Sequence, residues 1–239
     1  MPSLEQIQKD LYPCLCFRYD SPPRNGEPGF PESATPATFL RKLLAVKRLL
    51  IGYAVMIVLA SLGARWAQAP SLFRLPDPAL LTVGAAVAFA LVVCGAGVAL
   101  EKVPWYRRMA LFLKRLLTAP DVLGPKIDVW TAVVVALYSS VGEEAFFRGF
   151  VQPWLIDAAG GGATGVVLGI GATSIAFALA HPPLVKELWP WTVFALVIGV
   201  VLGALAVASG SLLPPVIAHG LINAINLVRL GHIHDPEAL

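Results

Sequence analysis

The sequence predicts an all-α protein, a polytopic bundle of about six transmembrane helices with one amphipathic helix lying in the membrane interface. Three observations lead to this fold class. Hydrophobic residues make up 57% of the 239 positions, only 14% are charged, and long apolar runs recur between short polar loops. Soluble domains carry about 25% charged residues and have no way to bury this much apolar surface. The lipid bilayer is therefore the first partner that the sequence predicts.

The expected elements divide the chain into three parts. Residues 1–42 form a flexible Pro-rich tail, residues 43–127 hold two spans and a basic interfacial segment, and residues 128–239 form a membrane core. Residues 104–118 alternate basic and apolar side chains, which is typical of an interfacial helix, although an ordinary basic loop has the same pattern. Each expected span is close to the ~20 residues that cross a hydrocarbon core. The spans are Leu49–Trp66, Ala79–Leu100, Val129–Val151, Thr164–Ala180, Trp191–Ala208 and Leu212–Val228.

The basic residues predict how the chain is inserted. Lysine and arginine gather in residues 41–48 and 102–126, where they flank apolar runs. The positive-inside rule places both segments on the cytoplasmic side. We therefore expect a multi-pass protein of the cell (inner) membrane with a cytoplasmic N-terminus, and no nucleic-acid partner. Residues 1–42 lack the apolar stretch of a cleavable signal peptide, so the first span is expected to direct insertion.

Cysteines and the C-terminal histidines carry little predicted chemistry. Cys94 stands in an apolar run and is expected to be a small packing residue. Cys14 and Cys16 are two reduced thiols, a lipidation site or half of a metal site. His232 and His234 are expected to be solvated, because no third ligand is near them in the sequence.

Charged side chains inside predicted spans are the main functional signal. A charged side chain at mid-bilayer costs ~2.5–3.5 kcal/mol on insertion scales, so its presence indicates a functional or structural role that offsets this cost. Most polar ionisable groups of the apolar half stand on three spans. They are Glu143, Glu144 and Arg148, then His181, then His219, Asn223 and Asn226.

Their spacing predicts which of them act together. Glu144 and Arg148 are four residues apart, so they can form an ion pair, whereas Glu143 lies about 100° further around the helix. A glutamate can act as general base on a water, a histidine can orient that water or protonate a leaving amine, and an asparagine amide can stabilise an oxyanion. Structural alternatives remain open. They are a structural Glu144–Arg148 pair, a helix-end cap at His181, and hydrogen bonding between helices by His219 and Asn223.

At these residues the sequence resembles the CAAX protease and bacteriocin-processing (CPBP, Abi) family of intramembrane endopeptidases. The resemblance covers roughly Asp128 to Val228. It rests on three motifs in order, Glu143-Glu144-Ala145-Phe146-Phe147-Arg148 (EExxxR), Phe177-Ala178-Leu179-Ala180-His181 (FxxxH) and His219-Gly220-Leu221-Ile222-Asn223 (HxxxN).

The resemblance implies a hydrolase that cuts near the C-terminus of a membrane-associated or lipidated substrate. It implies that Glu143 activates water, that His181 orients it, and that His219 and Asn223 are the second histidine and the oxyanion donor. Glu144, Arg148 and Phe177 become supporting residues. A myxosortase-like enzyme, which clips C-terminal sorting signals, is one subgroup that fits.

Three questions remain open at this stage. We expect no cofactor, because the motifs lack HExxH and asparagine is a poor zinc ligand, but a zinc held by Glu143, His181 and His219 is the alternative. Two alternative functions remain. One is a proton- or ion-coupled transporter, and the other is a non-catalytic membrane protein of the same fold that acts in binding or immunity. On a straight six-span map His181 also lies near the cytoplasmic end, whereas Glu143 and His219 lie deep.

Overall fold

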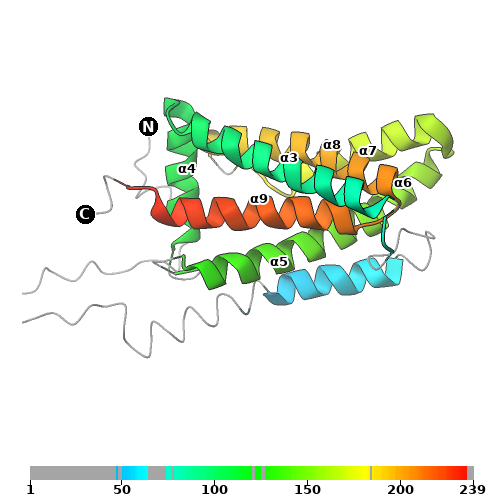
Figure 1. The fold of residues 1–239 in the computed structure, drawn as a ribbon, viewed down its shortest axis with the longest axis horizontal. Helices are drawn as coiled ribbons and strands as arrows, with labels where there is room; N and C mark the ends of the chain where they lie inside the picture. Colours follow the sequence, from blue (N-terminus) through cyan, green and yellow to red (C-terminus); the bar gives the residue numbers. More distant parts are fainter. Residues whose placement is uncertain are drawn as a thin grey trace, which may run out of the picture. The chain divides into compact units, whose positions relative to one another are not determined.

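A computed structural model shows a bundle of α-helices (Figure 1). It describes residues 47, 50–63, 74–76, 78–119, 122–124, 127–183 and 185–235. Within these ranges every regular element is helical and none is a β-strand, which confirms the predicted fold class. The tail at 1–42, with Cys14 and Cys16, lies outside the described residues.

The main helices agree closely with the predicted spans. They are Leu50–Gly63, α3 (Ala79–Leu100), α4 (Pro104–Leu117), α5 (Val129–Phe146), α7 (Gly162–Leu179), α8 (Trp189–Ser209) and α9 (Leu213–His232). Four of the described helices are long and apolar enough to cross a membrane, namely α3, α7, α9, and α8 with the short turn Lys186–Leu188 before it. The other two predicted spans are helices as well. Helix Leu50–Gly63 is shorter, and α5 carries two glutamates that lower its apolar character.

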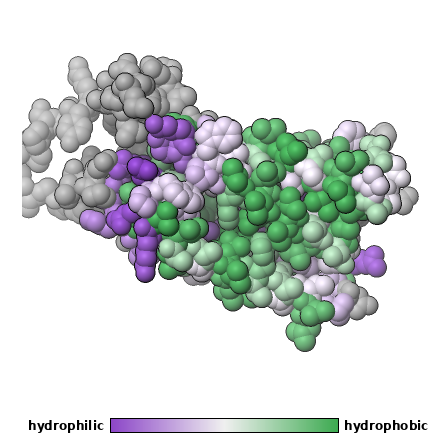
Figure 2. Space-filling view, turned by 90° about the horizontal axis from the view of Figure 1, so that it is seen from above, coloured by the Kyte–Doolittle hydropathy of each residue, from purple (hydrophilic) through white to green (hydrophobic). Residues whose placement is uncertain are grey.

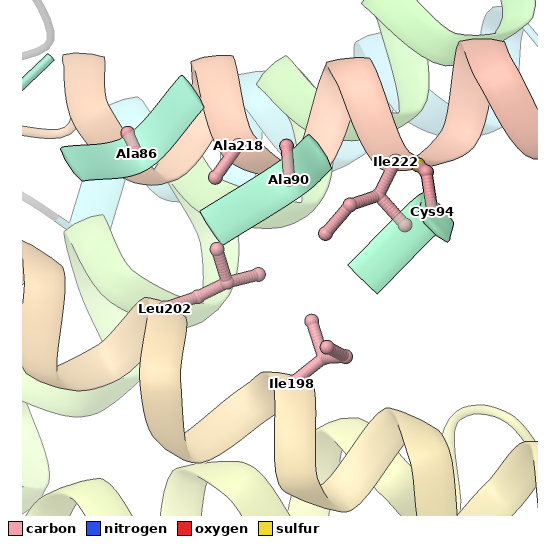
Figure 3. Packing of buried hydrophobic residues seen from close by; sticks show 7 residues of the cluster. All are labelled: Ala86, Ala90, Cys94, Ile198, Leu202, Ala218 and Ile222. Carbon is pink, nitrogen blue, oxygen red and sulfur yellow. The ribbon is translucent and has the colours of Figure 1, made fainter. Parts of the chain in front are cut away.

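Helices α3, α8 and α9 pack through a cluster of small and branched side chains (Figure 3). Ala86 and Ala90 of α3 are fully buried, and their small size brings the backbone of α3 close to its neighbours. Leu202 of α8 and Ile222 of α9 fill the space that these alanines leave. Cys94 is buried in the same cluster, which confirms its predicted role as a packing residue.

The third span does not end at Val151 as predicted. Helix α5 continues through a π-helical segment, η2 (Phe147–Val151), into α6 (Gln152–Ala158). The N–H of Gln152 donates to the carbonyl of Phe147, five residues back, which is the π pattern. Pro153 follows directly, and a proline removes one N–H and crowds the carbonyl four residues before it, so a widened turn here has a clear local cause.

This extension explains how His181 reaches the depth of Glu143. The chain turns after α6 at Gly160, Gly161 and Gly162, all of which have positive φ, and α7 runs back beside α6. With 18 residues, α7 spans only ~27 Å, so it ends part-way along α5. The straight six-span map, which placed His181 at a different depth from Glu143, is therefore wrong. Helix α7 starts from the far end of the extended third helix, so its last residues lie level with Glu143.

Helix α4 occupies most of the predicted interfacial segment. It begins at Pro104, carries basic side chains on one face, and lies across the end of the bundle (Figure 1). Trp105 at its start is exposed. Lys114 and Arg115 in its last turn bind residues that follow α9. Lys114 Nζ donates to the Ile233 carbonyl, and Arg115 forms a bidentate salt bridge with Asp235, with both N–O distances 2.7 Å. The helix expected here is confirmed.

Candidate active site

Glu144 is the centre of a fully buried polar cluster. Its Oε1 atom accepts one hydrogen bond from Arg148 Nη1 at 2.9 Å and another from His219 Nδ1 at 2.7 Å. Glu144 and Arg148 have no exposed surface, and His219 is 5% exposed. The predicted ion pair is therefore present, and it also fixes the ring of a histidine from α9.

Arg148 is held from three sides, which offsets the cost of burying its charge. Besides Glu144, its Nη2 donates to the Gly199 carbonyl of α8 at 3.1 Å. Its guanidinium lies 4.5 Å from the centroid of the Phe177 ring, a cation–π contact. Phe177 thus joins the motif on α7 to the motif on α5, and it also meets the rings of His181 and His219.

Glu143 points to both histidines. Its Oε2 atom lies 3.8 Å from His219 Nε2 and 3.9 Å from His181 Nε2. Both separations are too long for a direct hydrogen bond and suit a shared water. Glu143 Oε2 is buried and has no hydrogen-bond partner among the described residues. The three motifs therefore meet at one carboxylate oxygen.

Each histidine is oriented by the nitrogen that faces away from Glu143. His219 Nδ1 contacts the Glu144 carboxylate, and His181 Nδ1 contacts the Phe177 carbonyl at 2.8 Å. Since both partners only accept, each Nδ1 carries the proton. In the neutral rings, both Nε2 atoms are then free to accept a proton beside Glu143. The Trp191 ring packs edge-on against His181 at 5.1 Å and limits its rotation.

Asn223 lies one helical turn beyond His219 and faces α5. Its Nδ2 donates to Ser139 Oγ at 3.0 Å, and Ser139 lies one turn before Glu143. The two helices therefore present matched rows, with Ser139 and Glu143 on α5 opposite Asn223 and His219 on α9. This places an amide donor about one turn from the carboxylate that would activate water.

Residues 125–225 match the family model described as type II CAAX prenyl endopeptidase Rce1-like. The matched segment is similar to that family and is called the Rce1-like domain. It contains all seven residues singled out in the sequence and runs from just before α5 into α9. No curated protein and no solved structure matches the chain.

One polar residue beside the site stands outside the Rce1-like domain. The Tyr53 side chain, from helix Leu50–Gly63, interacts with Glu143 and with Ser139. Gly142 makes this approach close, because a Cβ there would lie 3.1 Å from the Tyr53 Cβ. The sequence analysis missed Tyr53. A lone tyrosine in an apolar run has no motif, and only the packing of the two helices brings it to Glu143.

The sequence analysis also missed two hydrogen bonds, one helical turn apart, that join the helix of Arg148 and Gln152 to α8. Gln152 Nε2 donates to the Gly203 carbonyl at 3.1 Å, one turn beyond the bond from Arg148 to Gly199. Both acceptors are glycines, and a Cβ on Gly203 would lie 2.6 Å from Gln152 Oε1. Arg148 and Gln152 also line a cavity of about 220 Å³. Their Nε and Oε1 atoms have no partner among the described residues.

Glutamate and histidine side chains can also be metal ligands. In the part of the chain that the structure describes, no three His, Cys, Asp or Glu side chains are arranged so that they could hold a metal ion. Glu143, His181 and His219 come closest together through the 3.8 and 3.9 Å separations given above. Two ligands of one tetrahedral zinc, each about 2.0–2.2 Å from the metal, lie roughly 3.4 Å apart. Both histidine nitrogens therefore lie slightly farther from Glu143 than two ligands of one zinc would.

Proposed function

We propose that this chain is an intramembrane endopeptidase that hydrolyses a peptide bond near the C-terminus of a membrane-associated or lipidated protein or peptide. One observation carries the proposal. A single buried carboxylate oxygen, Glu143 Oε2, lies 3.8–3.9 Å from the Nε2 atoms of two histidines, each with its other nitrogen occupied. The similarity of residues 125–225 to a family of CAAX endopeptidases supports the same class of reaction.

In the proposed reaction, Glu143 acts as general base. It takes a proton from a water that His181 and His219 orient, and the oxygen of that water forms a bond to the scissile carbonyl carbon. The C–N bond of the resulting tetrahedral species then breaks, and the proton passes from Glu143, or through His219, to the departing amine nitrogen. Glu144 and Arg148 take no part in bond making. They hold His219 in the orientation that this transfer needs.

Asn223 is the proposed oxyanion donor. Its Nδ2 has two N–H groups, and only one is needed for Ser139. The second can donate to the oxygen that gains negative charge when water attacks the carbonyl. A donor aimed at developing charge in a dry site contributes about 10²–10³ to the rate constant kcat.

The proposed chemistry uses no cofactor. Each group in the site is assigned an acid–base or hydrogen-bonding role that needs no metal. A zinc enzyme remains the alternative, and removal of metal distinguishes the two.

The proposal also covers the substrate and the place of the chain in the membrane. The bilayer and a membrane protein with an accessible C-terminal segment are the proposed partners, with removal of a C-terminal sorting signal (a myxosortase-like reaction) as one specific form. The chain is proposed to cross the cell membrane several times with its N-terminus in the cytoplasm, on the basis of the basic segments at residues 41–48 and 102–126.

The experiment that tests this function compares the C-termini of membrane proteins, by mass spectrometry, in cells that contain the chain and in cells that lack it. We expect at least one membrane protein with a shortened C-terminus only where the chain is present. Identical C-termini in both would contradict the proposed function. Flux of a solute across vesicles without any such cleavage would favour the transporter instead.

A further inference from the structure

A second polar cavity lies away from the peptidase site, at the end of the bundle where α3 and α9 finish. It has a volume of about 390 Å³ and is bounded by α3, α4, α9 and the residues that follow α9. Arg229, on its wall, follows His219 by ten residues on the same helix, or ~15 Å. The charged and polar residues that line it are Glu101, Arg107, Arg229, His232 and His234.

The wall of this cavity is built rather than incidental. Arg229 is fixed by two partners, Glu101 at 2.5 Å and Asn226 at 2.7 Å. Gly97 leaves room for it, because a Cβ at that position would lie 2.7 Å from Arg229 Nη1. Glu101 therefore binds Arg229 and offsets part of its charge, while Arg107 adds a second guanidinium from α4.

The C-terminal residues complete the cavity. His232 Nδ1 donates to the Val228 carbonyl at 2.7 Å, so its Nε2 is directed elsewhere. The chain beyond it is tied to α4 through Lys114 and Arg115, which hold Ile233 and Asp235. These contacts hold the segment that carries His234, which lines the cavity. The two histidines are exposed, as the sequence predicted, but they also line a formed cavity.

The surroundings are those of a membrane–water interface. Trp105 and Tyr106 begin α4 with rings 5.9 Å apart, and Trp105 is 45% exposed. Tryptophan and tyrosine gather at the level of lipid headgroups. Figure 2 shows most of the hydrophilic side chains of this face collected at one end of the described bundle, beside apolar surface that covers the middle of the face. Val98 lines the cavity and is also part of the exposed apolar surface of α3, with Leu91 and Val92.

We propose that this cavity binds the phosphate of an anionic phospholipid headgroup, with Arg107, Arg229 and His234 as donors and the exposed face of α3 as the path of an acyl chain. Guanidinium groups pair strongly with phosphate oxygens, and basic pockets between transmembrane helices are suited to lipid headgroups. The continuity from Val98 to the apolar face of α3 favours a lipid over a free anion. Glu101 balances the charge of Arg229, so the guanidinium of Arg107 remains as the net positive charge of the cavity.

The test uses the full-length chain in a neutral detergent, titrated with a short-chain phosphatidylglycerol and followed by native mass spectrometry. Parallel titrations use a short-chain phosphatidylcholine and inorganic phosphate. Arg107→Gln is compared with Arg108→Gln, since both arginines are exposed on α4 and only Arg107 lines the cavity. His234→Gln is a second variant at an exposed position, and thermal unfolding of each variant checks that it is folded.

We expect phosphatidylglycerol to bind at least about tenfold more tightly than phosphatidylcholine. Arg107→Gln should weaken that binding about tenfold, the usual effect of losing a charged hydrogen bond. Arg108→Gln should leave it within about twofold, and His234→Gln should lie between. Equal binding of the two lipids, or equal effects of the two arginine variants, would overturn the proposal. Inorganic phosphate binding as tightly as phosphatidylglycerol would overturn the lipid assignment in favour of a free anion.

Discussion

Glu144 Oε1 and His219 Nδ1 are 2.7 Å apart, although 75 residues separate them in the chain. The contact joins the first and the last of the three motifs inside the bundle. It gives the adjacent glutamates, Glu143 and Glu144, different tasks. Glu143 faces two histidine nitrogens across a gap, whereas Glu144 accepts hydrogen bonds from Arg148 and His219 at its Oε1 atom.

This division of tasks predicts that Glu144→Ala reduces stability more than Glu143→Ala. Removing Glu144 leaves the guanidinium of Arg148 buried without its carboxylate, and breaking a buried pair costs about 3–5 kcal/mol. Removing Glu143 loses the interaction with the Tyr53 side chain but leaves no buried charge without its partner, since Glu143 Oε2 has no hydrogen-bond partner among the described residues. Thermal unfolding of the two purified variants measures the difference. Equal unfolding temperatures would show that the Glu144–Arg148 pair does not stabilise the fold.

Tyr53 is expected to support Glu143 rather than the fold. Tyr53→Phe keeps the ring that packs on Gly142 and removes only the hydroxyl near Glu143 and Ser139. The rate constant for cleavage should fall about tenfold, the usual effect of losing one hydrogen bond to a charged group. Tyr138→Phe, on the exposed side of α5, is the matched control. If both variants cleave at the wild-type rate, Tyr53 has no part in the site.

Asn223→Ala should lower kcat by about 10²–10³ with little change in substrate affinity, because the oxyanion exists only during the reaction. Ser139→Ala removes the hydrogen-bond partner of Asn223 but leaves the amide donor in place, so it should keep most activity. Steady-state kinetics on both variants separates the two effects. A nearly normal rate in Asn223→Ala would remove this residue from the mechanism.

Packing between α6 and α7 gives a prediction about stability alone. A Cβ on Gly169 would lie 2.4 Å from Ile156 Cγ1 and 3.0 Å from the Ile156 backbone nitrogen, so Gly169→Ala must push α6 and α7 apart. We expect a loss of about 1–3 kcal/mol. Gly171→Ala, two residues further along α7, meets no atom within 4 Å. It should be neutral or slightly stabilising, as alanine favours helix over glycine. Denaturation of both variants tests this, and equal losses would contradict the close contact between Gly169 and Ile156.

Removal of metal tests the cofactor-free chemistry. Activity that survives exhaustive dialysis against a chelator is the expected result. Activity that is lost and then restored by zinc would favour the alternative in which Glu143, His181 and His219 are metal ligands.

Much of this site could be predicted from the sequence because its signals are local. Glu144 and Arg148 stand four residues apart on one helix, as do Phe177 and His181, and helix geometry alone places each pair on one face. The same residues also stand out because they are ionisable side chains inside apolar spans. A charged group there is costly, so its presence indicates a functional site.

Other parts depend on packing that no local pattern records. The π segment at Phe147–Val151 extends the third span, and that extension decides where α7 ends and hence where His181 lies. The approach of Tyr53 depends on the absence of a side chain at Gly142, and the bond from Gln152 depends on the same absence at Gly203. Each glycine looks like any other small residue in an apolar span until its neighbouring helix is known.

Glu143 is proposed to activate the water that cuts the substrate, and every other role in the site depends on this one. It is tested most directly by mass spectrometry of substrate C-termini after incubation of membranes with purified wild-type, Glu143→Gln or Glu187→Gln protein. Glu187→Gln makes the same chemical change in the turn before α8. We predict that Glu143→Gln leaves the substrates uncut while unfolding at the wild-type temperature, and that Glu187→Gln cuts them normally. Normal cleavage by folded Glu143→Gln protein would contradict the proposed role of Glu143.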